Sequence, residues 1–281
     1  MTGMTSVELE HCRELALERG GLFELTSRFL PANQLQPMLA LYALKKAVST
    51  IPRAHVDDAV KWAKLKWWSD EFKADPAATS RHPVLRALWL SGARAQLTDG
   101  LLQKLIGDAI SQIDSEPDSD ENAMFTRLAA LGSTDISLEL ALDKAEIDSR
   151  NLELLGAATG LFRVISSFAA SQRSETERLP LSMLAKYNVN VVQLEQTPYP
   201  AELTDIIEQL ARLGQDWFSR GLSGLNLFPG PPACGHLQLR WAMEQRRLGI
   251  ISKNVERFLA ADQTHGPADA WYAWRFLRRL K

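Results

Sequence analysis

The densest group of side chains able to bind a metal ion is a run of four acids, Glu116, Asp118, Asp120 and Glu121. Carboxylate oxygens are the ligands that hard cations prefer. The run lacks the glycine and the terminal glutamate of an EF-hand loop, and Pro117 prevents a continuous helix through it. Charge clusters of this kind are common on protein surfaces, so we expect a solvated loop between two helices.

Adjacent acids and scattered histidines are weaker candidates for chemistry. Asp57 and Asp58 are neighbours in sequence, and on a helix their side chains would point about 100° apart, away from a common ion. No two histidines have the helical spacing of a metal-binding pair. The histidines are His11, His55, His82, His236 and His265. We therefore predict no metal site and no catalytic residue here, and expect the histidines to be structural or exposed.

Residues 61–72, KWAKLKWWSDEF, combine aromatic and basic side chains. Trp62, Leu65 and Trp68 lie on neighbouring parts of one helical face. Aromatic rings interleaved with lysines can bind nucleic acid, but the net charge of -2 gives the chain no overall attraction for it. We predict core packing of these rings, with lysine stems along the rim, and no nucleic-acid partner.

The last segment, residues 267–281, is basic and amphipathic. It ends in WYAWRFLRRLK, in which tryptophan, phenylalanine and leucine alternate with arginine and lysine. Such a segment can lie on an anionic membrane or dock against a protein partner. It can equally be a final helix that packs its apolar face on the domain, and the pattern does not separate these alternatives.

The elements that position these residues are predicted to be helices. Apolar residues recur at spacings of three and four, whereas alternating β-branched runs are scarce. Prolines and polar stretches mark the boundaries of about eight to ten helices. We predict an all-α chain with one domain over residues 1–281, and the Pro- and Gly-rich segment 228–235 is the best place for a break.

Composition narrows the class of protein further. The 281 residues are 46% hydrophobic and 23% charged, as in an ordinary globular protein with a substantial core. Cys12 and Cys234 lack the spacing of a zinc or redox motif and are expected to be reduced thiols. The first residues do not resemble a signal peptide, and no segment has the roughly 20 apolar residues of a membrane span. These features predict a cytoplasmic protein, with peripheral contact to the inner membrane left open.

The order of several strings resembles the squalene/phytoene synthase family, over much of residues 9–190. The strings are FELTSRFLPANQLQPMLALYALKKAV (23–48), KLKWWSDEF (64–72), HPVLRAL (82–88), LGAATGLFRVISSF (155–168) and RLPLSMLAKYNV (178–189). The resemblance implies an all-α isoprenoid synthase fold, with helices around a central cavity. In active members, two aspartate-rich motifs hold Mg²⁺ at the mouth of that cavity. The ions stabilise the departing diphosphate while two prenyl chains are joined head to head.

The first of these motifs is degenerate in this chain. After LYAL, Lys46 matches the family's arginine, while Ser49, Thr50 and Arg53 occupy the positions of the three aspartates. Hydroxyl groups are weak substitutes for carboxylates, and an arginine places a positive charge where a cation should bind. A shifted alignment does not restore the motif, because residues 39–56 contain no Asp or Glu.

The second motif is degenerate as well. It should follow Gly156 and Gly160, where the chain has Ser166, Ser167 and Ala170 in place of acids. Both halves of the metal clamp are therefore missing, and we predict neither a catalytic residue nor a metal cofactor.

One branch of the family looks this way, and it includes the mitochondrial assembly factor for respiratory complex I. LGAATGLFRVI followed by RLPLSMLAKYNV resembles that branch more than an active synthase. The branch tends to have an arginine near the position of Ser166, whereas this chain has Arg163 close by.

Three functions follow from the resemblance. The first is a non-catalytic assembly factor or other protein-binding component. The second is a protein that binds an isoprenoid or another lipid, with Lys45, Lys46, Arg53 and Arg163 as metal-free phosphate contacts. The third is an active prenyltransferase that uses Mg²⁺ through relocated carboxylates. The acids available for that role are Asp57, Asp58, Asp70 and Glu71.

Overall fold

The computed structural model describes residues 6–17, 21–73, 82–169, 179–194, 198–223, 225, 235–260 and 266–279. All regular secondary structure in these residues is helical, which confirms the predicted all-α class. The helices are α1 (Ser6–Ala16), α2 (Leu22–Ser27), α3 (Ala32–Ser49), α4 (Asp58–Lys73), α5 (Pro83–Leu90), the 3₁₀ helix η1 (Arg94–Gln96), α6 (Asp99–Ser111), α7 (Glu121–Asp143), α8 (Ser149–Ser167), α9 (Leu181–Lys186), α10 (Val191–Leu194), α11 (Glu202–Leu222), α12 (Gly235–Ile251), α13 (Val255–Ala260) and α14 (Pro267–Arg279).

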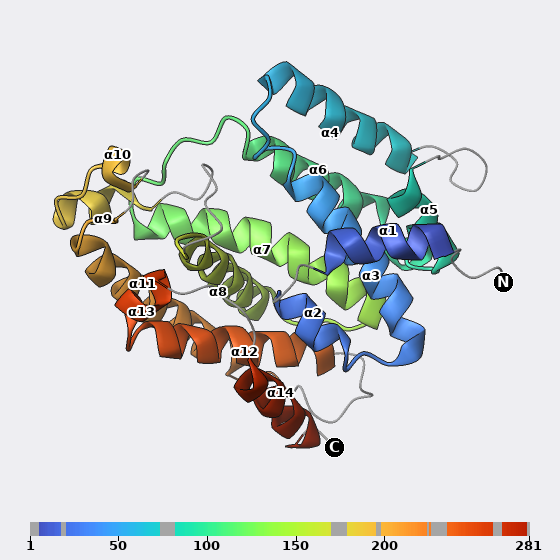
Figure 1. Ribbon diagram of the computed structural model, residues 1–281. Coiled ribbons are helices and arrows are strands. Elements are labelled where there is room, and N and C mark those ends of the chain that lie inside the picture. Colours follow the sequence, from blue (N-terminus) through green and yellow to red (C-terminus); the bar gives the residue numbers. More distant parts are fainter. Residues whose placement is uncertain are drawn as a thin grey trace.

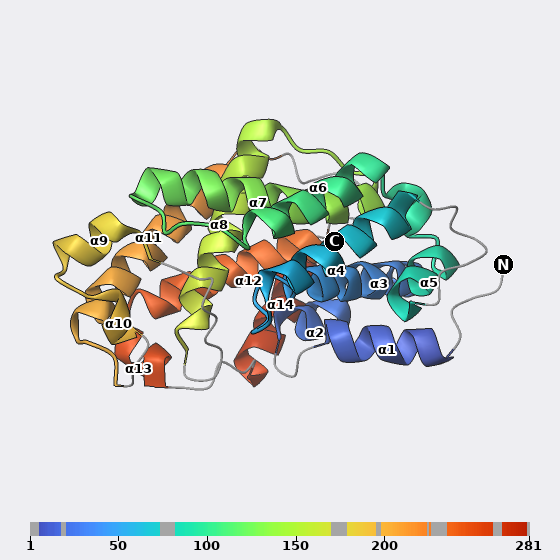
Figure 2. The ribbon, with the colours of Figure 1, turned by 90° about the horizontal axis from the view of Figure 1, so that it is seen from above.

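The helices form a bundle with α7 near its middle (Figure 1). Helices α1 and α5 lie at one end of the molecule and α9, α10 and α13 at the other, as the view from above also shows (Figure 2). Helix α8 packs along α7 and against α11, which in turn packs on α12. Segments from both ends of the sequence thus meet around the central helices. No described helix is both long and apolar enough to cross a bilayer.

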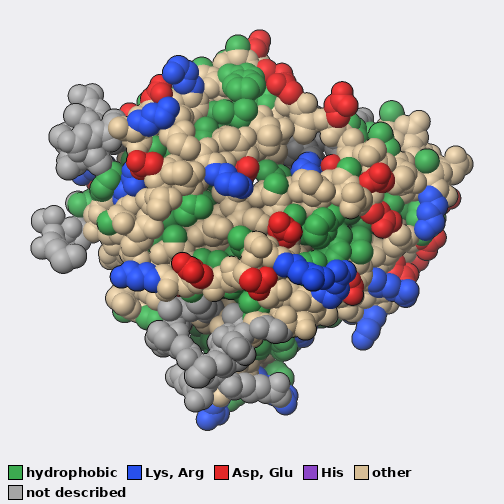
Figure 3. Space-filling view, turned by 180° about the vertical axis from the view of Figure 1, so that it is seen from behind, with side chains coloured by type: hydrophobic (Ala, Val, Ile, Leu, Met, Phe, Trp, Pro, Cys, Tyr) green, Lys and Arg blue, Asp and Glu red, His purple; other side chains and the backbone are tan. Residues whose placement is uncertain are grey.

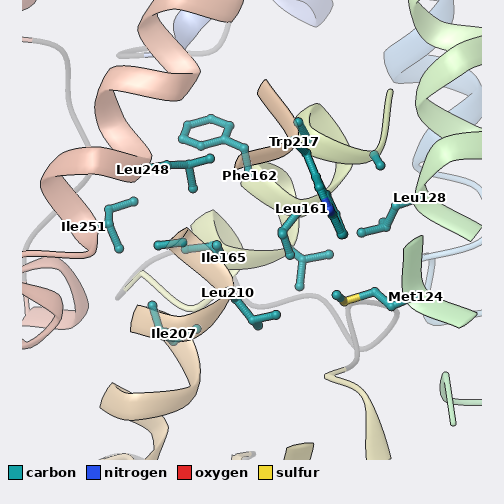
Figure 4. Close-up of a cluster of buried hydrophobic side chains, with 14 of the residues drawn as sticks. Met124, Leu128, Leu161, Phe162, Ile165, Ile207, Leu210, Trp217, Leu248 and Ile251 are labelled. Carbon is teal, nitrogen blue, oxygen red and sulfur yellow. The ribbon is translucent and has the colours of Figure 1, made fainter. Parts of the chain in front are cut away.

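Two large clusters of buried apolar side chains fill the bundle. The first joins the start of α7 to α8, α11 and α12, and Figure 4 shows side chains of these helices interdigitating, for example Leu128, Leu161, Leu210 and Leu248. The second joins α1 and α3 to α6. Helix α7 contributes to both, with Leu138 and other residues of its last turns in the second cluster. A register shift of α7 would therefore disturb both clusters.

The predicted helix boundaries are confirmed at several prolines and polar residues. Pro31 directly precedes α3, Pro83 begins α5 and Pro180 precedes α9. The predicted number of helices was too small, because the boundary rules do not detect one- and two-turn helices such as α2, α10 and α13. Residues 226–234, which hold most of the proposed break at 228–235, lie outside the described residues.

The acidic run lies at the start of α7 and serves as a helix cap. The Asp120 carboxylate accepts hydrogen bonds from the backbone nitrogens of Asn122 and Ala123, at 3.0 and 2.8 Å. Asp118 forms an ion pair of 2.7 Å with Arg127. The run thus contains the predicted interhelical loop, and its carboxylates satisfy backbone donors and one arginine. The prediction of a solvated loop was wrong for Asp118, which is buried with its ion pair to Arg127.

Helix α4 departs from the prediction of a fully packed aromatic face. Leu65 and Trp68 are buried as expected. Trp62 is 42% exposed and Trp67 is 41% exposed, so the prediction was wrong for Trp62. The reason is that α4 is an outer helix (Figure 1), which buries a narrow stripe against α6 and leaves neighbouring positions to solvent.

Helices α7 and α8 approach so closely that only glycine fits at their crossing. A Cβ atom on Gly132 would lie 2.6 Å from the Cα atom of Gly156. A Cβ atom on Gly156 would lie 2.6 Å from the backbone nitrogen of Ser133. The obstacles are backbone atoms, which cannot move aside without separating the helices.

We expect Gly132→Ala to destabilise the protein by about 1–3 kcal/mol, because the clash outweighs the better helix propensity of alanine. The matched control is Gly107→Ala in α6, where an added Cβ meets nothing within 4 Å. That change should stabilise the protein by about 0.5–1 kcal/mol. Urea unfolding of both variants measures these values, and equal effects at the two glycines would contradict the close crossing.

Candidate functional site

A group of charged side chains, all of them buried or partly buried except the exposed Arg163, lies where α3, α7, α8 and α12 meet. We call it the central charge network. Its charged members are Lys45, Asp135, Glu139, Arg163, Arg240 and Glu244, and its neutral members are Tyr42, Thr159 and His236. The network draws on helices that are far apart in sequence, so only the folded bundle assembles it.

Glu139 is the hub of the network, and its side chain is 0% exposed. One carboxylate oxygen lies 2.7 Å from the Lys45 amine and also accepts a hydrogen bond from Arg240. The other oxygen accepts a hydrogen bond of 3.1 Å from the Tyr42 hydroxyl. Arg240 donates to that same hydroxyl at 2.7 Å. These contacts tie α3 and α12 to α7 through a single carboxylate.

The remaining contacts extend the network to α8. Asp135 is ion-paired with Arg163 and lies 3.8 Å from Lys45. Glu244 accepts a hydrogen bond of 2.9 Å from Thr159 and lies 3.7 Å from Arg240. The network thus holds three basic and three acidic side chains, and it can neutralise itself without a bound ion.

Electrostatics keeps Glu139 ionised in spite of its burial. Burial alone would raise the pKa of this carboxyl, but Arg240 and Lys45 outweigh it and lower the pKa to about 2. Burial also lowers the pKa of His236 to about 4, so this imidazole is neutral near pH 7. For Glu244, burial is the dominant influence and raises the pKa.

Aromatic contacts fix the neutral members of the network. Tyr42 stacks on Phe23, with ring centroids 3.6 Å apart and planes within 6°. The His236 ring lies edge-on to both, and its Nε2 atom is 3.3 Å from the Tyr42 oxygen. This confirms that His236 is structural, as predicted for the histidines.

The positions of the first family motif lie at the end of α3 and just beyond it. The Ser49 hydroxyl donates to the Lys46 carbonyl at 3.4 Å, and the Thr50 hydroxyl donates to the same carbonyl at 3.0 Å. Arg53 is exposed in the turn that follows. The two hydroxyls thus satisfy carbonyls of their own helix end.

The positions of the second motif lie at the end of α8. Ser167 donates a hydrogen bond of 2.7 Å to the Val164 carbonyl, and Ser166 is partly buried beside it. Ala170 lies outside the described residues.

The structure brings together two of the four predicted phosphate contacts. Lys45 and Arg163 both pair with Asp135. Lys46 points about 100° around the helix from Lys45, and Arg53 lies beyond the end of α3. The positive charges of Lys45 and Arg163 are therefore already balanced in part by the carboxylate of Asp135.

The four acids considered as relocated metal ligands lie in or next to outer helix α4. Asp57 accepts a hydrogen bond of 2.8 Å from the Ala59 backbone nitrogen, as a helix cap does. Asp58 and Asp70 are ion-paired with lysines of their own helix, and both side chains are more than half exposed. Glu71 is partly buried on the same helix. Among the described residues, no group of three or more His, Cys, Asp or Glu side chains is arranged to hold a metal ion.

Sequence reasoning missed most of the central charge network, namely Tyr42, Thr159, Arg240, Glu244 and the two acids of α7. One signal was present in the sequence. Asp135, Glu139 and Asp143 recur every four residues in the otherwise uncharged second half of α7. Acids on a single face of a buried helix indicate that basic or hydrogen-bonding side chains lie opposite them inside the protein.

A cleft of about 800 Å³ opens between α3, α4 and α5. Its lining is mostly apolar and includes Ile51, Val60 and Trp67, with Lys64 and Thr50 among the polar residues. The cleft therefore adjoins the end of α3 that carries the first degenerate motif.

Removing the charge of Glu139 tests the network. We expect Glu139→Gln to destabilise the protein by about 3–5 kcal/mol, because Lys45 and Arg240 lose their buried counter-charge. Urea unfolding gives the value. The matched control is Glu208→Gln, which breaks an exposed ion pair with Arg212 and should change stability by less than about 1 kcal/mol. Similar losses in both variants would contradict a special role for Glu139.

The buried carboxyl of Asp143 should make the stability of the protein depend on pH. Burial and the charge of Glu139 raise its pKa to about 7, and neither oxygen has a hydrogen-bond partner among the described residues. The folded state thus holds a proton that the unfolded state releases near pH 4. The contribution of this bound proton to the free energy of unfolding is complete below about pH 4. It is lost as the pH rises towards 7, with a slope of up to about 1.4 kcal/mol per pH unit.

We therefore expect Asp143→Asn to raise stability more at about pH 8 than at about pH 5. Comparing the variant with the natural chain at each pH cancels contributions from the other titrating groups. An equal effect at both pH values would show that the carboxyl titrates normally.

Comparisons with known proteins agree with the geometry of the bundle. The family model described as squalene/phytoene synthase matches residues 20–265, farther along the chain than the resemblance of the strings extends. A crystal structure of squalene synthase HpnC from Alicyclobacillus acidocaldarius is 16% identical, with a TM-score of 0.67, and the match covers 88% of this chain and 94% of that one. A dehydrosqualene synthase in complex with ligand is 14% identical, with a TM-score of 0.71, and the match covers 98% and 95%. No curated protein sequence matched this chain.

The two solved structures establish the fold, since their identities are too low to transfer an activity. The family match spans most of the sequence. The chain therefore belongs to the squalene/phytoene synthase family.

Proposed function

We propose that this chain is a non-catalytic member of its family that acts by binding a protein partner, as an assembly factor does. The observation that carries the proposal is the chemistry of the motif positions. Ser49, Thr50 and Arg53, at the end of α3 and in the turn after it, offer no carboxylate to a metal ion. Ser166 and Ser167, at the end of α8, offer none either. The donor set does not fit Mg²⁺, which proteins usually hold through one or two carboxylates. The hydroxyls of Ser49, Thr50 and Ser167 donate instead to backbone carbonyls of their own helices.

The central charge network supports the same proposal. Asp135 and Glu139 are two of the buried carboxylates of α7, and binding Mg²⁺ between them would require them to leave Lys45, Arg163 and Arg240. Separating a buried ion pair costs about 3–5 kcal/mol. The acids thus act as internal counter-ions to arginine and lysine.

The surface of α4 supports a role in protein binding. Val60, Trp62 and Trp67 are each about two-fifths exposed. Val60 and Trp67 line the cleft, whereas Trp62 lies on another side of α4. Figure 3 shows hydrophobic side chains at the surface of the molecule among interspersed acidic and basic ones. Exposed apolar patches with a polar rim are typical of interaction sites. The resemblance to the complex I assembly factor extends the proposal to the assembly of a respiratory complex.

Binding of an isoprenoid or other anionic lipid is the second candidate. It is favoured by Arg240, whose Nε and Nη2 groups are buried and have no hydrogen-bond partner among the described residues. Buried guanidinium donors are normally satisfied, and a phosphate oxygen would satisfy them. The third candidate, an active prenyltransferase with relocated carboxylates, has less support because those acids belong to α4 and the turn before it.

We expect the purified chain to release no diphosphate above background from farnesyl or geranylgeranyl diphosphate with Mg²⁺. The reason is that no carboxylate pair holds the metal that neutralises the leaving group. Product chromatography and diphosphate release measure this. Turnover that depends on Mg²⁺ at an enzymatic rate would refute the proposal.

Affinity purification from native membranes, with proteins and lipids identified by mass spectrometry, separates the two binding functions. A protein partner should be retained by the natural chain and lost with Trp62→Ala/Trp67→Ala. The control variant Arg212→Gln/Arg220→Gln changes exposed side chains of α11 and should retain it. Recovery of an isoprenoid without protein would favour the second candidate.

A further inference from the structure

Helix α14 has two faces with different environments. Ala273 is buried, and Tyr272, Phe276 and Leu277 pack with it against a third apolar cluster formed by α2 and α12. The only acid of the helix, Asp269, also turns inward and pairs with Arg246 and Arg247 of α12. Contacts of the inner face therefore hold α14 against α2 and α12.

The outer face of α14 carries large aromatic side chains that this packing does not use. Trp271 is 56% exposed and Trp274 is 48% exposed. The Arg275 guanidinium lies 5.3 Å from the ring of Trp271, and that of Arg278 lies 4.8 Å from the ring of Trp274. Both pairs are four residues apart, so they form one continuous stripe along the helix. We call these four residues the tryptophan–arginine stripe.

We propose that the tryptophan–arginine stripe docks this protein on an anionic lipid bilayer. Tryptophan rings favour the interface between headgroups and acyl chains, where the indole N–H stays hydrated. Each arginine near an anionic surface contributes about 1 kcal/mol of attraction. Stable membrane contact needs such a combination of an apolar and a basic signal.

The charge of the outer face of α14 and the position of this helix favour a lipid bilayer as its binding partner. The outer face of α14 has no acid, since Asp269 faces α12, and the sequence adds Arg279 and Lys281 at the same end. The helix has 13 residues, which corresponds to about 20 Å, and it projects from the lower edge of the molecule in Figure 1. A projecting helix can lie flat on a planar surface, with both tryptophans at one depth. The proposal rests on α14 alone and holds whether or not the protein is catalytic.

Sedimentation with phosphatidylcholine vesicles, with and without phosphatidylglycerol, tests the proposal. The full chain should bind the vesicles that contain phosphatidylglycerol, and binding should weaken as salt is added. Arg275→Gln/Arg278→Gln should lower the partition coefficient on the order of 30-fold. Trp271→Ala/Trp274→Ala should reduce binding to both kinds of vesicle. Circular dichroism and thermal unfolding check that these outward-facing changes leave the fold intact.

Matched controls use the same residue types on other helices. Trp62→Ala/Trp67→Ala removes tryptophans of α4 that are 42% and 41% exposed, and Arg212→Gln/Arg220→Gln removes exposed arginines from α11. Both variants should bind vesicles as the natural chain does. The proposal is overturned if the natural chain binds neither kind of vesicle, or if the α14 variants bind as well as the controls. Recovery of a protein through the stripe, without vesicle binding, would assign this face to a protein partner instead.

Discussion

A single carboxylate with no exposure to water constrains the whole bundle. An isolated charge at Glu139 would be unfavourable by several kcal/mol, and it is tolerated because Lys45 and Arg240 reach it from two other helices. These contacts require a fixed register between α3, α7 and α12. The apolar clusters on either side supply most of the driving force for folding, but their packing alone tolerates small shifts that the ion pairs do not.

The same network bears on the proposal that this chain is non-catalytic. Catalysis by a metal clamp needs carboxylates that are free to accept an ion, whereas Asp135 and Glu139 of α7 are already paired with basic side chains. The hydroxyls at the motif positions of α3 and α8 bond to carbonyls of their own helices. In the proposed function the interior serves as a structural support, and exposed side chains of the outer helices α4 and α14 contact the partner or the membrane.

Much of the fold could be predicted from local signals. Spacings of three and four residues identified the helices, and prolines at 31, 83 and 180 marked where three of them begin. The acidic run at 116–121 was correctly interpreted as a loop between helices, whereas the helix cap formed by Asp120 was not predicted. Short helices such as α10 were not predicted, because a single turn is too short to show a helical periodicity. Trp62 was misplaced because periodicity indicates a face but does not show how much of it a neighbour covers.

The sequence by itself determined the helical class, the family resemblance and the absence of acids from residues 39–56, because these depend on residue types and spacing along the chain. Only the tertiary structure decided that Lys45 meets Glu139 and that Arg240 joins them, since these residues are 94 and 101 positions apart. It also separated the two faces of α14, which amphipathic patterning had left open. Helix packing determines both outcomes, because it sets which side chains share low-dielectric space and which remain in water.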